Sequence, residues 1–200
     1  MNPAKQYLGD IIGGGIMLRE SRLIAELLLS EPDVETWSQK IKNENMLQKT
    51  SVHSAKRFAS TIKKRLEPMG KEFLADFIEA DDIYATQLLL IAIMLNSPVV
   101  ADFMKTELAD AHRLCREKLD SHCWMEFYEQ RSRVIPELTE YSESSIKKMG
   151  NNVIKVLADT QYLESGRSKI LQTVFVQPET LAWVKKLEKP ELIEALQIGR

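Results

Sequence analysis

The chain has 200 residues, of which 44% are hydrophobic, and its formal net charge is −2. The apolar content is sufficient for a packed core and excludes a globally disordered protein. The near-neutral charge excludes a basic signature over the whole chain, so any nucleic-acid role must depend on local patches. The two cysteines, Cys115 and Cys123, form no C-x-x-C pair and no disulfide framework, which favours a reducing, cytoplasmic setting.

The N-terminal residues show no secretory signal. The triplet Gly13-Gly14-Gly15 lacks the Gly-Lys-Ser/Thr continuation of a phosphate loop, so we predict a flexible entry to the first helix and no nucleotide site. The longest apolar run covers residues 88–95, whereas a bilayer span needs about 20 residues. We therefore expect a buried core helix there and no membrane span.

Residues 1–120 are predicted to form a helical bundle, because apolar residues recur at helical spacing between capping residues, prolines and glycines. The predicted helices cover residues 18–29, 34–43, 51–66, 72–79, 83–96 and 98–119.

The third predicted helix carries the most one-sided charge in the chain, since no acidic residue lies between Lys49 and Arg65. Solvated helices usually interleave charges of opposite sign, so this pattern favours an anionic partner over an ordinary solvated face. The residues expected to contact phosphate here are Lys56, Arg57, Lys63, Lys64 and Arg65.

Residues 121–200 are predicted to form a separate C-terminal unit, or one packed onto the bundle as a single domain. After a helix at 122–133, Ser142 is a good N-cap for a long helix, Gly166 marks a turn, and the branched and aromatic residues of 170–176 suit a strand. Pro178 then opens another helix. Helix, hairpin and helix in this order predict a winged-helix-like unit with a short β-hairpin on an otherwise all-α fold.

The helix after Ser142 has an apolar stripe and an opposite polar face. Lysine neutralises phosphate and releases counterions, and asparagine can pair with an adenine edge. The residues expected in a DNA groove are Lys147, Lys148, Asn151, Asn152 and Lys155. Arg167 and Lys169 would hold phosphate on or near the wing. Glu140 and Glu143, near the start of this helix, count against phosphate at its N-terminus.

Other chemistry receives little support. His112, Cys115, His122 and Cys123 could in principle bind zinc, but their spacing is not that of a zinc site, and a core stripe explains them better. No catalytic motif is recognisable. We therefore expect no metal, no cofactor and no enzymatic activity.

Three segments taken together resemble the BrxA family of BREX bacteriophage-defence systems. They are YLGDIIGGGIMLRESRLIAELLLS, KNENMLQKTSVHSAKRFASTIKKRL and ESSIKKMGNNVIKVLADTQYL. The resemblance extends over nearly the whole chain and lies in pattern and order, since none of the segments is a catalytic motif. It implies a helical body similar to the antitermination factor NusB.

The resemblance further implies a non-enzymatic protein that binds double-stranded DNA and works with other BREX proteins. It transfers no list of base-contacting residues. A protein-interaction adaptor is the alternative, with the basic helices meeting acidic subunit surfaces. Binding to single-stranded RNA is a third possibility, which the scarcity of aromatic residues on the polar faces disfavours.

Overall fold

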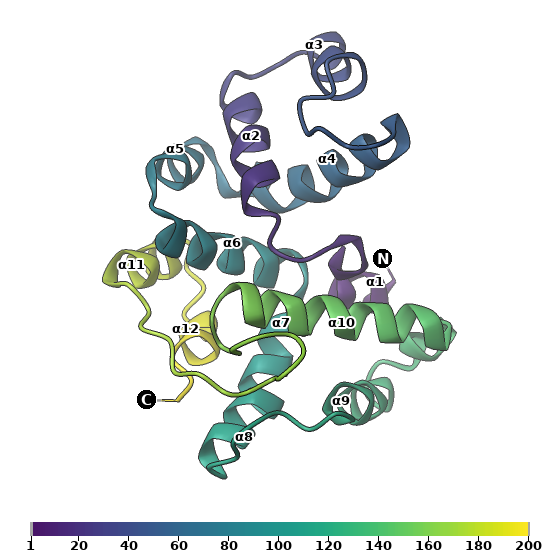
Figure 1. Cartoon of the computed structure of the whole chain (residues 1–200), viewed down its shortest axis with the longest axis vertical. Helices are drawn as coiled ribbons and strands as arrows, with labels where there is room; N and C mark the ends of the chain where they lie inside the picture. Colours follow the sequence, from purple (N-terminus) through teal and green to yellow (C-terminus); the bar gives the residue numbers. More distant parts are fainter. Residues whose placement is uncertain (1, 200) are drawn as a thin grey trace.

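The computed structural model describes residues 2–199, and these residues are predominantly helical (Figure 1). The α-helices are α1 (Pro3–Leu8), α2 (Leu18–Leu29), α3 (Val34–Ser38), α4 (Val52–Leu66), α5 (Lys71–Glu79), α6 (Asp82–Asn96), α7 (Pro98–Phe103), α8 (Ala109–Arg113), α9 (Cys123–Ser132), α10 (Glu143–Asp159), α11 (Pro178–Lys186) and α12 (Glu191–Leu196). Short 3-10 segments are η1 (Ile11–Gly13), η3 (Glu67–Met69) and η5 (Pro136–Glu140). Two π-helical segments, η2 (Gln39–Asn43) and η4 (Met104–Leu108), continue α3 and α7.

Helix α6 is the centre of the core. Every residue from Leu88 to Met94 is buried, as the apolar run predicted. α2, α4, α5, α7 and α11 all pack against this helix. One continuous hydrophobic core joins buried residues from Ala4 to Ile198, so both predicted units contribute to it. The predicted boundary at residue 120 stays a prediction.

A single buried amide on α6 fixes the C-terminal part of the chain. The Gln87 side chain is 3% exposed and is surrounded by apolar neighbours on the same helix. Its Nε2 donates to the Phe175 carbonyl at 2.9 Å, and its Oε1 accepts from the Gln177 N–H at 3.0 Å and the Thr180 hydroxyl at 2.7 Å. Since a buried amide without partners is costly, these bonds specify where the segment before α11 lies.

The capping residues confirm most of the predicted helix starts. Ser51, Asp81 and Ser142 each accept a hydrogen bond from a first-turn N–H, and Pro98 opens α7. The predicted helix over 98–119 is wrong at its end, because the helical segment stops at Arg113.

The chain turns after Arg113, and Cys115 takes a left-handed φ of 51°. The following residues bond instead to the loop after α10. The Leu119 N–H donates to the Lys169 carbonyl and the Leu171 N–H to the Glu117 carbonyl, both at 3.0 Å. Long-range backbone pairing therefore replaces the last predicted turns of the helix.

The winged-helix-like unit and its β-hairpin are wrong predictions, since residues 2–199 contain no strand. Two isolated antiparallel bridges remain, Lys118 with Ile170 and Leu163 with Leu171. Residues 172–177 form no regular secondary structure, and the Gln87 side chain binds the Phe175 carbonyl and the Gln177 N–H where a second strand was expected. The helical class is confirmed.

Among residues 2–199, no single helix is long and apolar enough to cross a membrane. Within the same described range, α6 taken together with residues 98–113 reaches that length and composition, but the two are bent by 108°.

The packing of α9 on α10 depends on a glycine. A Cβ built on Gly150 would lie 2.3 Å from Trp124 Cδ1, and the Trp124 indole N–H donates to the Ile146 carbonyl at 2.8 Å. We predict that Gly150→Ala lowers the free energy of unfolding by about 2 kcal/mol, despite the better helix propensity of alanine. A Cβ at Gly166 would meet only Ile154, at 3.8 Å, so Gly166→Ala is the control. Urea unfolding of both variants measures this, and equal midpoints would contradict the packing argument.

Candidate nucleic-acid interface

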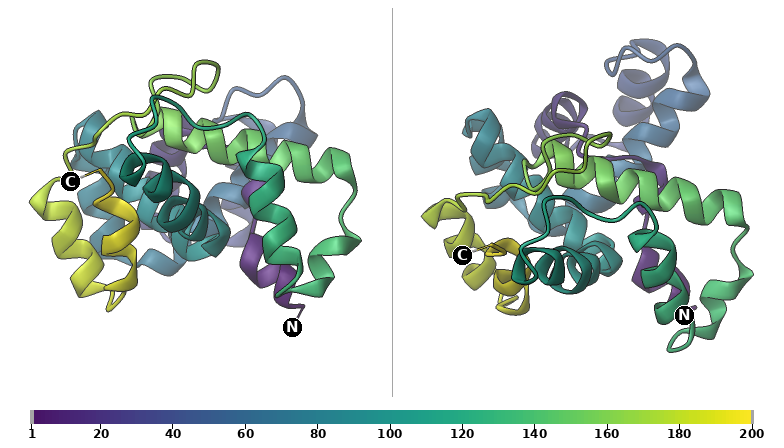
Figure 2. Two further views of the ribbon diagram at one scale, coloured as in Figure 1. Left: turned by 90° about the horizontal axis from the view of Figure 1, so that it is seen from below. Right: turned by 60° about the horizontal axis from the view of Figure 1, so that its bottom comes forward.

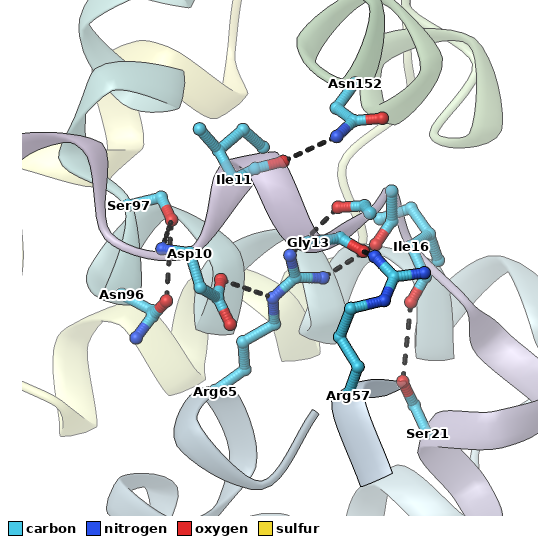
Figure 3. A network of polar contacts seen from close by, with 12 residues as sticks. Asp10, Ile11, Gly13, Ile16, Ser21, Arg57, Arg65, Asn96, Ser97 and Asn152 are labelled. Atoms are coloured by element: carbon cyan, nitrogen blue, oxygen red, sulfur yellow. Dashed lines mark hydrogen bonds and ion pairs between the residues drawn. The ribbon is translucent and has the colours of Figure 1, made fainter. Parts of the chain in front are cut away.

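The two helices with basic outer faces, α4 and α10, lie on either side of the glycine-rich segment that follows α1 (Figures 1 and 3). η1 contacts both helices. From α4, an Arg57 guanidinium nitrogen donates to the Gly13 carbonyl at 3.4 Å, and from α10 the Asn152 amide donates to the Ile11 carbonyl at 2.8 Å. The segment is therefore held between two helices, and it is not the flexible entry predicted from its glycines.

Arg65 is a correction to the predicted phosphate contacts. Its side chain is 2% exposed and forms an ion pair with Asp10, with 3.0 Å between Nε and Oδ1. Its two terminal nitrogens donate to the carbonyls of Gly15 at 2.7 Å and Gly14 at 2.9 Å (Figure 3). Burial raises the pKa of the Asp10 carboxyl and lowers that of the Arg65 guanidinium, while the opposite charge counteracts each change. Arg65 thus binds the glycine-rich segment and cannot reach a phosphate outside.

Asn152 is a second correction. Its amide is half-buried against η1, and its bond to Ile11 aims it at the protein rather than at a DNA groove. Of the two asparagines predicted to contact bases, only Asn151 is exposed.

The exposed positive charge of α4 is smaller than the sequence indicated. Lys56, Arg57 and Lys64 are exposed. Lys63 is half-buried, pairs with Glu67 at 3.4 Å and lies 4.7 Å from the centre of the Trp37 ring. Lys49, just before the helix, is paired at 2.6 Å with Glu20 of α2. Both acidic partners lie outside the acid-free stretch: Glu67 is four residues after Lys63, whereas Glu20 is brought to Lys49 only by the packing of α2.

On α10, Lys148, Asn151 and Lys155 are exposed, and Lys147 pairs with Glu143 at 2.6 Å. The aliphatic part of Lys155 borders the glycine-rich segment, because a Cβ on Gly15 would lie 3.3 Å from Lys155 Cδ. Lys155 therefore lies where α10 and that segment meet.

The loop after α10 carries Arg167, which is exposed, and Lys169, which is half-buried with a φ of 53°. Both line a hollow of about 610 Å³ together with Arg116 and Lys118. The last two residues are basic neighbours that the sequence interpretation missed. The change of chain direction at Cys115 places Arg116 and Lys118 beside this hollow, and no local sequence pattern predicts that change.

The possible zinc ligands do not come together. In the part of the chain that the structure describes, no three His, Cys, Asp or Glu side chains are arranged to hold a metal ion. Cys115 is exposed, whereas Cys123 is buried, and burial raises the pKa of its thiol to about 11. A thiol that stays protonated at neutral pH is a poor metal ligand.

Comparisons with known proteins agree on one family. A family model described as BrxA matches residues 5–188. A "BREX protein BrxA" of Escherichia coli O9:H4 (strain HS) is 44% identical over 96% of this chain and 91% of its own length. A "BREX protein BrxA" of Paramagnetospirillum magneticum is 28% identical over 97% and 98%. The crystal structure of an uncharacterized protein from Magnetospirillum magneticum superposes with a TM-score of 0.87 at 28% identity, covering 96% of this chain and 98% of that one.

Replacing Arg65 should be far more damaging than replacing its exposed neighbour on α4. Arg65→Met leaves Asp10 and two glycine carbonyls without their partner in a buried site, so we expect a loss of about 3–5 kcal/mol in the free energy of unfolding. Arg57→Met removes two exposed contacts, the 3.4 Å bond to the Gly13 carbonyl and the contact with the Phe58 ring, and should cost less than about 1 kcal/mol. Thermal unfolding measures both, and a similar loss in the two variants would refute the role of Arg65.

The Glu20–Lys49 pair should make stability depend on acid pH. Burial alone would raise the pKa of Glu20, but the hydrogen bond and charge of Lys49 outweigh it and the pKa is lowered. The stability that the ionised Glu20 carboxylate contributes is therefore fully present above the ordinary glutamate pKa. It is lost as the pH falls through the lowered pKa of Glu20 in the folded protein. Glu20→Gln should cost about 0.5–1 kcal/mol at pH 7 and less near pH 3. Glu26→Gln, on the exposed side of α2, is the control; a pH-independent cost for Glu20→Gln would contradict the ion pair.

Proposed function

Since the chain belongs to the BrxA family, whose relatives are proteins of BREX phage-defence systems, we propose that it binds double-stranded DNA as an accessory protein of that defence. In this role it performs no chemical step of its own and acts together with other BREX proteins. We expect contacts to the DNA backbone, because the exposed side chains of α4 and α10 are mainly lysines, whose ammonium groups neutralise phosphate.

The observation that carries the proposal is the placement of exposed cations on two helices that flank one immobilised segment. Lys56, Arg57 and Lys64 lie on α4, and Lys148 and Lys155 lie on α10. The bonds of Arg65 and Asn152 to the glycine-rich segment connect the two helices through that segment. Cations held in position on a rigid scaffold can neutralise successive phosphates without first being ordered, and they release the counterions bound there.

Sequence specificity should be low. Arg65 and Asn152 are engaged within the protein, which leaves Asn151 as the exposed amide of the predicted set. Phosphate contacts fix position and orientation on a duplex but carry no direct sequence information. The net charge of −2 further limits non-specific attraction to the exposed basic faces.

An adaptor that docks other defence subunits is the second candidate. It is favoured by exposed apolar side chains, among them Val34 (88% exposed), Val134 (73%) and Leu114 (58%). These belong to different parts of the fold, namely α3, the end of α9 and the end of α8. Single exposed apolar residues are normal on soluble proteins. They therefore support an adaptor role less strongly than the two basic faces support DNA binding.

A salt titration of binding to a duplex of random sequence tests the proposal. We predict that Lys148→Ala with Lys155→Ala weakens binding and reduces the slope of log K against log salt by about two units, because two phosphate contacts are lost. Lys71→Ala with Lys186→Ala removes the same charge from α5 and α11, where both lysines are ion-paired, and should leave the slope unchanged. Fluorescence anisotropy of a labelled duplex gives both quantities.

Three other outcomes would change the conclusion. If the α10 variant binds like the parent, the same titration with Lys56→Ala and Lys64→Ala decides whether α4 alone is the site. If the α10 pair and the α4 pair weaken binding only to the same extent as the control pair, DNA is attracted by the net charge of the protein and not by a defined surface. If the parent chain does not bind at moderate salt, autonomous DNA binding is refuted and the adaptor becomes the leading candidate.

A further inference from the structure

A cavity of about 760 Å³ lies beside α10, and the duplex-binding proposal uses only Lys155 of its lining lysines. It is bordered by the start of α9, one face of α10 and the loop after α10, which passes over the helix, and it is open to solvent on one side (Figure 2). Its apolar lining includes Trp124, Ile154 and Ala158. Cavities of roughly 300–1,000 Å³ with an apolar lining and a few polar groups are typical small-molecule sites.

The walls of the cavity are fixed by close contacts. Gly150 lets the Trp124 ring lie directly on α10, and the indole N–H is bound to the Ile146 carbonyl. The loop is closed by its own bonds, since the Ser168 N–H donates to the Ser165 hydroxyl and the Lys169 N–H to the Ser165 carbonyl, both at 3.0 Å. The Lys169 carbonyl in turn accepts from Leu119. The site is therefore formed before any ligand arrives.

The polar lining combines two ammonium groups with several hydrogen-bonding groups. Lys155 and Lys169 both line the cavity, and the charge of Lys155 also acts on the Asp159 carboxylate in the same lining, where burial raises the pKa of that carboxyl and the Lys155 charge counteracts the rise. Lys147, at the same wall, is paired with Glu143. The start of α9 also lines the cavity, and its first N–H groups are bonded to Asp120, since the His122 N–H donates to the Asp120 carboxylate at 2.7 Å. Asn151, Asp159 and Glu164 supply amide and carboxylate groups.

We propose that this cavity binds a single nucleotide. The phosphate would lie between Lys155 and Lys169, and the base against the apolar wall formed by Trp124, Ile154 and Ala158. Two cations suit a phosphate, but phosphate alone leaves the apolar wall without a function. The carboxylates and the Asn151 amide suit the amino and ring N–H groups of a base edge. An apolar ligand would leave both ammonium groups without an anionic ligand.

The same chemistry has two sources, a free nucleotide or an unpaired nucleotide of a DNA strand. The second source rests on the proposed duplex binding, whereas the first does not. The position of Lys155 is compatible with an unpaired DNA nucleotide as the ligand, because Lys155 lines this cavity and also borders the glycine-rich segment between the two basic faces. A base that is already unpaired would enter without the cost of unstacking it from the duplex.

The first experiment uses the full chain and dAMP. The chain has three tryptophans, so Trp37→Phe with Trp183→Phe leaves Trp124 as the reporter in the cavity wall. We expect saturable quenching of its fluorescence by dAMP. Saturation-transfer NMR of the adenine protons with the unsubstituted protein gives an independent readout should the tryptophan variants fold poorly. Inorganic phosphate and deoxyadenosine are the two part-ligands to compare, and both should bind at least about tenfold more weakly than dAMP.

Substitutions then locate the site. Lys169→Ala should weaken dAMP binding about tenfold through the loss of a charge-assisted contact, and Ala158→Phe should weaken it by filling the cavity without changing charge. Lys71→Ala with Lys186→Ala is the matched control and should leave it unchanged. The nucleotide site is refuted if dAMP does not bind, if inorganic phosphate binds as tightly, or if neither Lys169→Ala nor Ala158→Phe weakens the binding.

The second experiment separates the two sources and keeps this inference apart from duplex binding. A duplex with one unpaired adenine is compared with the perfect duplex of equal length. We expect a DNA nucleotide to be the ligand if the duplex with the unpaired adenine binds about tenfold more tightly than the perfect duplex. Ala158→Phe should then abolish this difference, and dAMP should compete with the unpaired adenine. Equal binding of the two duplexes, with dAMP still bound, identifies a free nucleotide. Loss of binding to the perfect duplex in Lys148→Ala with dAMP binding intact would show that the two sites act separately.

Discussion

The buried ion pair between Asp10 and Arg65 ties the glycine-rich segment after α1 to α4. Its guanidinium binds a carboxylate and two glycine carbonyls at once, so three backbone or side-chain acceptors of one short segment converge on a single side chain of α4. A buried charge is tolerated only when its partners satisfy it, and this requirement fixes the segment's path. α10 then packs against the same segment through Asn152. The relative position of the two basic helices follows from this arrangement.

The glycines of this segment allow that geometry. Gly14 has a φ of 152°, which side chains rarely adopt, and a Cβ on Gly13 would lie 2.6 Å from the Thr61 hydroxyl on α4. With no side chains in the way, the carbonyls approach Arg65 and Arg57 closely. The loss of conformational entropy at the glycines is thus offset by charge-assisted hydrogen bonds from one helix.

α10 has a different environment on each side. One side faces the glycine-rich segment and belongs to the proposed duplex surface, and the other forms a wall of the cavity under the following loop. Lys155 contacts both. A lysine with a long apolar stem can pack its methylene groups against Gly15 while its ammonium group remains free for a phosphate, so one residue can connect a backbone contact with a nucleotide site.

The local patterns of the sequence determined the helical class, the central apolar helix and the capped starts at Ser51, Asp81 and Ser142, because these depend on neighbours within one or two turns. The same patterns indicated two basic helices. They did not distinguish exposed cations from buried ones, since Arg65 and Lys49 find their partners, Asp10 and Glu20, through tertiary packing and not through helix spacing.

The predicted hairpin failed for a related reason. Branched residues favour extended backbone, but whether that backbone becomes a strand depends on what lies beside it. Here a buried glutamine on α6 and a bend near Cys115 supply the hydrogen bonds, and both are distant in sequence. The sequence by itself determined most of the helical segments and their apolar faces, although it missed α1 and extended the helix that begins at Pro98 beyond Arg113. Only the tertiary structure decided which polar groups remain free to bind a ligand, because each buried donor and acceptor must first find its partner within the fold.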